Sequence, residues 1–410
     1  MPVSNSPENW QAPVAFAGSF NVRDSQAAVE AFNRLMFTAL QQPTQPVPSQ
    51  AKPATEHLFV SNVRFLSMAA VVFVHCISAS FLMAGLSPSG ELERVMRQPV
   101  SFDIIGFFLI SGFLMSEGLT KRSPGEYLKR RLRRIFLPWL FWYLLFFASL
   151  LINDAMLGRL RVMSLHEDAQ WALHRLVFCL FSSVYWFVPN LLIALCILLA
   201  CRRFLFDLRL GGALLALSLF YGVNIYAHWI PFQGHSEALL GFIFYLWLGA
   251  WAARNFGLIQ ALNERIPALS LMVLGALAGL AALLESGVLF AAGNPHPMNT
   301  LRICNQAYSV VLILAIFKLR KPVWPRAVNV RTTTFGIYLI HIIVLSLLTS
   351  VIKQPIGKAL AGQTWGWAAA AAVCLSLGVF AVVYGVSLFL TQWALNNPRL
   401  RWMVGAPLSS

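Results

Sequence analysis

Residues 365–389 read WGWAAAAAVCLSLGVFAVVYGVSLF and contain no charged side chain in 25 consecutive positions. A helix of about 20 apolar residues spans the hydrocarbon core of a bilayer, so this stretch is long enough to cross one. The whole chain has the same character, because 58% of its 410 residues are hydrophobic and only 11% are charged. A soluble domain carries about 25% charged residues. The composition therefore predicts an all-α protein that crosses a membrane many times.

Ten apolar segments of roughly spanning length recur along the chain and predict a polytopic bundle of about ten transmembrane helices. They cover residues 60–83, 102–119, 135–152, 184–201, 212–229, 238–254, 268–285, 303–319, 334–352 and 366–392. The segment 169–183 is shorter and more polar at its start. We expect it to be interfacial or re-entrant.

The chain is predicted to contain a membrane domain between two tails. Residues 1–56 include the stretch QQPTQPVPSQAKP at 41–53, whose proline content is typical of a linker. We predict a mobile cytoplasmic tail here, with regulatory docking as the alternative. The membrane domain is predicted over residues 57–395 and a cytoplasmic C-terminal tail over residues 396–410.

The distribution of positive charge predicts the orientation of the chain. An even number of spans places both termini on one side of the membrane. If that side is the cytoplasm, the inner loops carry more than twice as many Lys and Arg residues as the outer loops, as the positive-inside rule requires. Orientation thus accounts for most of the net charge of +15 without a nucleic-acid partner. The six cysteines are scattered and form no CxxC pair, so neither a metal site nor a disulfide framework is expected.

Two ionisable residues share one predicted transmembrane helix. Residues 61–76 read SNVRFLSMAAVVFVHC, with Arg64 and His75 eleven positions apart. Eleven steps of about 100° return to within about 20° of the starting direction, so the two side chains lie on one face, about 16 Å apart along the axis. Lipid does not tolerate such a face, which must look into the bundle. A structural histidine bonded to a neighbouring helix is the alternative to a functional one.

Two further stretches bring small and basic residues close to the membrane. SFDIIGFFLISGFLM, at 101–115, contains Gly106, Ser111 and Gly112, which permit close helix packing. The stretch 126–143, EYLKRRLRRIFLPWLFWY, places five basic residues within positions 129–134. The positive-inside rule predicts some basic residues here, but so dense a cluster also suits a phosphorylated ligand, since guanidinium binds phosphate in a bidentate manner.

The order and spacing of these motifs resemble acyltransferase family 3, the integral-membrane O-acyltransferases that modify bacterial surface glycans and related compounds. The matching elements are Arg64 with His75, FFLISGFL at 107–114, Arg131 and Arg134 with Ile135 and Pro138, VYWFVPNLL at 184–192, and IYLIH at 337–341. The resemblance covers residues 58–392. One departure concerns Trp186, because the acidic residue that follows the corresponding tryptophan in many glycan-modifying members is absent. This departure leaves the acceptor class open.

The resemblance implies transfer of an acyl group, with acetyl as the leading expectation, from cytoplasmic acyl-CoA to a hydroxyl of a carbohydrate or glycolipid. Acyl-CoA is then a co-substrate, no bound cofactor is expected, and the location is the bacterial inner membrane. An imidazole can accept a proton near neutral pH, so His75 is the candidate base, with an acyl-histidine intermediate as the less favoured variant. Arg64 is expected to hold the donor or to orient His75.

Other candidate residues fall into two groups. The predicted donor site consists of Arg130, Arg131, Arg134, Ser111 and Gly112. The predicted acceptor site or pocket consists of Asp103, Trp186, Glu237 and His341. Ser111 is expected to pack or to form hydrogen bonds rather than to react.

A secondary transporter that relays protons through His75, Glu285 and His341 is the rival from another class. The sequence shows no internal repeat of the kind on which many transporters are built, which disfavours this reading. A scaffold protein would leave the face that carries Arg64 and His75 unexplained.

Overall fold

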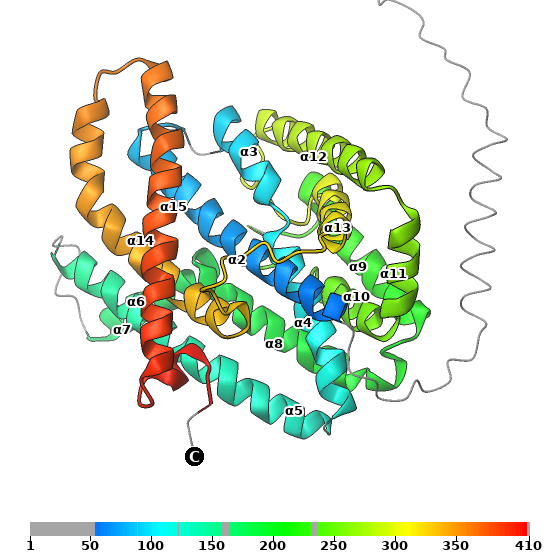
Figure 1. Cartoon of the computed structure of the whole chain (residues 1–410). Helices are drawn as coiled ribbons and strands as arrows, with labels where there is room; N and C mark the ends of the chain where they lie inside the picture. Colours follow the sequence, from blue (N-terminus) through cyan, green and yellow to red (C-terminus); the bar gives the residue numbers. More distant parts are fainter. Residues whose placement is uncertain are drawn as a thin grey trace, which may run out of the picture. The chain divides into compact units, whose positions relative to one another are not determined.

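The computed structural model describes residues 54–87, 89–121, 123–156, 165–231, 234 and 236–407. The described part is helical and contains no strand, which confirms the predicted all-α class (Figure 1). The predicted N-terminal tail lies outside the described residues up to residue 53. The α-helices are α2 (Ala54–Met83), α3 (Glu91–Arg97), α4 (Asp103–Thr120), α5 (Pro124–Arg131), α6 (Leu137–Met156), α7 (Leu165–Ser182), α8 (Phe187–Ala200), α9 (Leu208–Ala227), α10 (Ile243–Arg254), α11 (Phe256–Arg265), α12 (Ala268–Ala291), α13 (Ile303–Phe317), α14 (Val330–Leu360) and α15 (Trp365–Asn396).

Five short turns of other helix types connect these elements. They are η1 (Gln98–Val100), the π-helical turn η2 (Leu132–Phe136), η3 (Val184–Trp186), η4 (Arg202–Phe204) and η5 (Arg401–Val404).

Within the described residues, seven helical stretches are long and apolar enough to cross a membrane. An eighth span results if Gln170–Ser182 and Val184–Ala200, which meet at a bend of 78°, are counted together. Each of the ten expected apolar segments contains a helix, but ten spans are not confirmed. Helices α10 and α13 have only 12 and 15 residues, because part of each apolar segment forms a loop or turn instead of helix.

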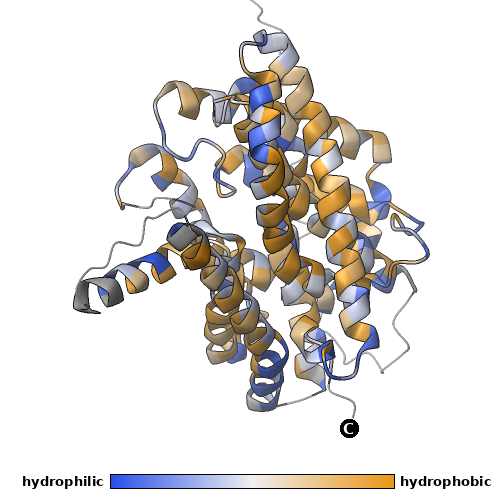
Figure 2. Cartoon of the chain, turned by 90° about the vertical axis from the view of Figure 1, so that its left-hand side faces the viewer, coloured by the Kyte–Doolittle hydropathy of each residue, from blue (hydrophilic) through white to orange (hydrophobic). Residues whose placement is uncertain are grey.

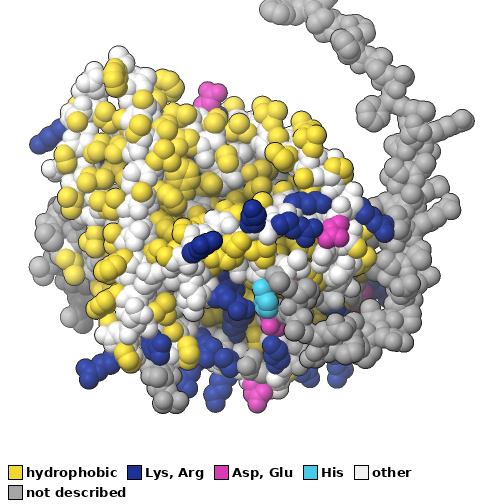
Figure 3. Space-filling model, viewed as in Figure 1, with side chains coloured by type: hydrophobic (Ala, Val, Ile, Leu, Met, Phe, Trp, Pro, Cys, Tyr) yellow, Lys and Arg dark blue, Asp and Glu magenta, His cyan; other side chains and the backbone are white. Residues whose placement is uncertain are grey.

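The hydropathy of the helices agrees with burial in lipid. The long helices are hydrophobic over most of their length, and hydrophilic residues concentrate at their ends and in the connections (Figure 2). In the space-filling view, hydrophobic side chains form a broad surface, and Lys and Arg gather in a band across the middle of the face and along its lower edge, near α5 and the end of α15 (Figure 3). A broad apolar surface bordered by basic side chains is typical of an integral membrane protein.

Helix α2 lies at the centre of the packing that forms the site. It contacts α4, α14 and α15, and two glycines of α4 allow neighbouring helices to approach closely. Gly106 leaves no room for a Cβ beside Ser67 of α2, and Gly112 leaves none beside the backbone of α10 at Leu246. Small residues at such contacts allow helix backbones to approach in lipid, where packing rather than the hydrophobic effect drives association.

Candidate active site

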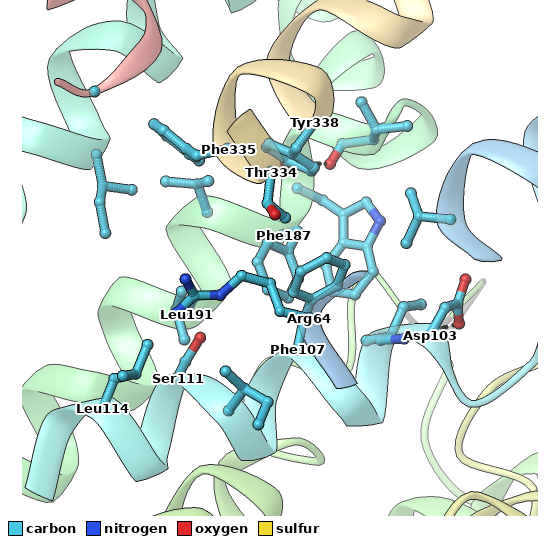
Figure 4. Close-up of a pocket in the computed structure, with 18 of the residues that line it drawn as sticks. Arg64, Asp103, Phe107, Ser111, Leu114, Phe187, Leu191, Thr334, Phe335 and Tyr338 are labelled. Carbon is cyan, nitrogen blue, oxygen red and sulfur yellow. Dashed lines mark hydrogen bonds between the residues drawn. The ribbon is translucent and has the colours of Figure 1, made fainter. Parts of the chain in front are cut away.

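A cavity of about 470 Å³ opens among α2, α4, the end of α5 with η2, the α7–α8 bend, the connection before α13, α14 and the C-terminal segment. Figure 4 shows Asp103 at one side of the cavity and Ser111 with Leu114 at the other, with Arg64, Phe107 and Phe187 between them. The predicted site residues that line it are Arg64, His75, Asp103, Ser111, Arg131, Arg134 and Trp186. The structure thus brings together predicted side chains from four regions of the sequence.

Helix α2 supplies one wall of the cavity along a single face. Arg64, Val71 and His75 all line it, as a spacing of seven and then four residues in an α-helix requires. Both ionisable side chains are half-buried, since each opens toward the cavity. Arg64 therefore lies toward one end of the cavity and His75 about three helical turns further along α2.

Four arginines surround the end of the cavity at which α2 begins. Arg131 and Arg331 interact electrostatically with Arg64, and Arg134 lines the same cavity. Arg131 is held by Tyr127, whose hydroxyl oxygen accepts a hydrogen bond from its Nε at 2.8 Å. Among the described lining residues, Asp103 is the only carboxylate, and it lies at the opposite side. Several guanidinium groups gathered at one end of a cavity favour a ligand with several negative charges.

The local backbone explains how the basic side chains reach the cavity. Pro138 has no N–H and cannot bond to the carbonyl of Arg134, four residues earlier. The chain forms a π-helical turn over Leu132–Phe136 at this point, a feature that is frequent at functional sites. The Arg134 carbonyl instead lies against Gly405 of the C-terminal segment, where a Cβ would come within 2.7 Å of the oxygen.

The C-terminal segment closes part of this same end. Residues 404–407 line the cavity, and the carbonyl of Met403 accepts a hydrogen bond from Nε1 of Trp142 at 2.9 Å. Gly405 has φ +78°, a backbone conformation that glycine adopts without strain. The segment predicted as a tail therefore folds back after α15 and completes the wall of the cavity.

The bend between α7 and α8 places aromatic side chains in the cavity. Non-helical backbone at membrane depth must find hydrogen-bond partners inside the protein. Here the Tyr338 hydroxyl donates to the carbonyl of Val184 at 2.7 Å, and Nε1 of Trp139 donates to the carbonyl of Tyr185 at 2.9 Å. The Tyr185 hydroxyl donates in turn to the carbonyl of Leu339 at 2.8 Å. These bonds fix the bend against α6 and α14 and hold Trp186 in the wall.

The opposite end of the cavity is polar. Asp103 is buried, and its Oδ1 accepts a hydrogen bond from the backbone N–H of Ile104 at 2.8 Å. Arg97 interacts electrostatically with it, and Ser101 and Thr300 line the same cavity. Donors and acceptors of this kind suit a ligand that carries hydroxyl groups.

Four predicted site residues lie outside the lining of the cavity. Arg130 is exposed on α5, and Gly112 contacts α10 instead of the cavity. Glu237 lies in the connection before α10, near His296. Burial lowers the pKa of His296, and the negative charge of Glu237 partly opposes that effect. His341 is fully buried behind His75, and the two imidazole ring centroids are 5.7 Å apart.

Sequence reasoning missed several residues of the cavity. Arg331 lies ten positions before His341 at the start of α14, and the positive-inside rule alone explains a basic residue there. Arg97 ends the short helix α3, Thr300 lies in the connection before α13, and neither belongs to a motif. The C-terminal residues 404–407 have no apolar periodicity that would have identified them.

The spanning helices, and the cavity with ionisable side chains among them, define an integral membrane protein with a buried site. The sequence profile of a family described as an acyltransferase domain, acyltransferase family 3, matches residues 57–385. The chain belongs to this family, and its general class is that of a membrane acyltransferase. Comparisons with curated proteins and with solved structures found no match.

Proposed function

We propose that the protein transfers an acyl group, acetyl in the leading case, from cytoplasmic acyl-CoA to a hydroxyl of a carbohydrate or glycolipid acceptor. This is an acyltransferase reaction of the EC 2.3.1 type. The observation that carries the proposal is one cavity that joins an arginine-rich end to a polar end, with His75 in its lining between Arg64 and the outer end of α2.

The basic end fits the phosphates of the donor. Arg131 and Arg134 bind them in this proposal, with Arg64 and Arg331 nearby. The pantetheine arm of CoA separates its phosphates from its thioester, so the reacting carbonyl lies well away from the arginines. The rise along α2 from Arg64 to His75, about 16 Å for eleven residues, leaves room for that arm.

His75 performs the proton transfer. Its unprotonated ring nitrogen accepts the proton of the acceptor hydroxyl as the oxygen attacks the thioester carbonyl. The new C–O bond forms, the C–S bond breaks, and the CoA sulfur leaves as a thiolate that takes up the proton. The acceptor is held at the polar end by Asp103, Arg97 and Thr300, with Trp186 as an apolar surface beside the sugar ring.

The charge distribution supports the orientation in this proposal. The start of α2, the basic turn after α5 and the C-terminal segment all contribute to one end of the cavity, and Lys and Arg gather near the same elements (Figure 3). Under the positive-inside rule this end faces the cytoplasm, which places both termini there and opens the donor site toward cytoplasmic acyl-CoA. The bacterial inner membrane is the proposed location.

The test uses the purified protein in liposomes with radiolabelled acetyl-CoA and a panel of soluble and lipid-linked glycans. We expect label in an acceptor and release of free CoA in equal amount. A parallel uptake assay without acyl-CoA tests the rival, a proton-coupled transporter. Uptake driven by a proton gradient, with no acyl transfer to any acceptor, would contradict the proposed function.

A further inference from the structure

His341 lies in the interior of α14 and does not line the cavity. Its side chain is completely buried. Its Nδ1 lies 2.7 Å from the carbonyl oxygen of Tyr338 and 3.1 Å from that of Ile337. A carbonyl oxygen only accepts hydrogen bonds, so Nδ1 must carry the proton. The neutral ring therefore has an unprotonated Nε2, which can only accept.

This Nε2 has no hydrogen-bond partner among the described residues. Buried polar atoms in proteins are nearly always bonded, because a missing bond leaves the cost of desolvation uncompensated. Such an atom points to a partner that the resting geometry does not yet reach. The ring of His75 is the neighbouring imidazole, with its centroid 5.7 Å from that of His341 and a ring-plane angle of 39°.

We propose that His341 is a positioning residue, whose Nε2 accepts a hydrogen bond from a ring N–H of His75 during turnover. The proposal rests on the proposed acyl transfer. A proton held on the side of His75 that faces His341 leaves the other ring nitrogen unprotonated, facing the cavity, where it can take the proton of the acceptor hydroxyl. The same logic applies wherever a base is oriented by a third group.

The resting geometry agrees with this role. The two rings lie side by side, with their centroids 5.7 Å apart, and in this proposal a rotation of the His75 side chain closes the hydrogen bond. Catalytic hydrogen bonds are commonly long when no substrate is bound and shorten in the reacting complex. The bonds from His341 to the helix backbone keep its own ring fixed, so that His75, half-exposed to the cavity, is the ring that moves.

Two substitutions at position 341 separate positioning from packing. His341→Gln keeps an acceptor oxygen near the place of Nε2, whereas His341→Leu has a similar size and no acceptor. In liposomes, per folded molecule, we expect His341→Leu to lower kcat about 10- to 100-fold and His341→Gln to stay within about threefold of wild type. The KM values for acyl-CoA and acceptor should not change, because His341 does not line the cavity. Equal kcat in the two variants, or a higher kcat in His341→Leu, would overturn the proposal.

A second measurement does not depend on turnover. ¹⁵N NMR of histidine-labelled protein, saturated with a thioether analogue of acetyl-CoA that cannot transfer its acyl group, reports which ring nitrogen of His75 carries the proton, with the signals assigned through His75→Gln. We expect a single tautomer in the wild-type protein and a mixture in His341→Leu. Identical His75 signals in both proteins would overturn the pairing of the two histidines. If the wild-type protein transfers no acyl group, the proposed function fails while this spectrum still decides the pairing.

Discussion

Gly112 of α4 and Gly249 of α10 form a reciprocal contact between two helices. A Cβ added to Gly112 would overlap the carbonyl oxygen of Leu246, and a Cβ added to Gly249 would overlap that of Leu109. Both clashes involve backbone, which cannot move aside as a flexible side chain can. The glycine of the FFLISGFL motif therefore sets the distance between α4 and α10 and, through α4, the position of Ser111 in the cavity wall.

We predict that Gly112→Leu abolishes activity by preventing correct packing of α4 against α10. The smaller change Gly112→Ala should lower the free energy of unfolding by about 1–3 kcal/mol, the usual cost of overpacking. The thermal midpoint in detergent measures this change. Gly378→Ala in α15 is the matched control, because a Cβ there meets no atom within 4 Å. A Gly112→Ala protein as stable as the control would show that the two helices can separate without cost.

Gly405 offers a test of how the C-terminal segment supports the donor end. An alanine there combines an unfavourable backbone conformation, φ +78°, with a Cβ 2.7 Å from the Arg134 carbonyl and 2.8 Å from the Phe335 ring. We expect Gly405→Ala to displace the segment and raise the KM for acyl-CoA. Gly362→Ala shares the backbone conformation, φ +77°, but lies in open space. If both variants show the same donor KM, the contact with Arg134 does not shape the site.

The basic cluster divides into side chains that face the cavity and side chains that do not. Arg131 and Arg134 line the cavity, whereas Lys129 and Arg133 are exposed. Arg131→Ala with Arg134→Ala should raise the KM for acyl-CoA at least about tenfold and leave the acceptor KM unchanged, since hydrogen bonds between charged groups contribute about 1.5–3 kcal/mol each.

Lys129→Ala with Arg133→Ala removes the same amount of charge from the same turn and serves as the control. Steady-state kinetics with varied acyl-CoA at saturating acceptor compares the two double variants. A similar rise in donor KM in both would mean that the cluster acts only as a general positive surface, in which case high salt should abolish the difference from wild type.

The sequence allowed the fold class and part of the cavity lining to be predicted, for physical reasons that differ between residues. Arg64 and His75 could be predicted as a pair because helical periodicity alone places them on one face of the helix. Arg131 and Arg134 could be predicted as candidates, but which basic side chains face inward depends on the π-helical turn and on Pro138. Periodicity does not reveal either effect.

Other features depend on contacts between distant segments. The return of residues 404–407 to the cavity rests on the packing of Gly405 against Arg134, which no local pattern encodes. The count of ten spans is not confirmed, because the hydropathy of an apolar stretch such as 238–254 does not show where its helix begins, and α10 begins only at Ile243. The bend before α8 likewise depends on hydrogen bonds to α6 and α14.

The central claim is that His75 is the general base, and turnover per folded molecule of His75→Gln in liposomes tests it most directly. Glutamine preserves hydrogen bonding but cannot accept a proton at neutral pH, so the variant should fold and bind acyl-CoA through the arginines at the other end of the cavity. The account predicts a loss of acyl transfer of about 10²- to 10⁴-fold, the usual effect of removing a general base. Transfer within about threefold of wild type, far less than that loss, would contradict it.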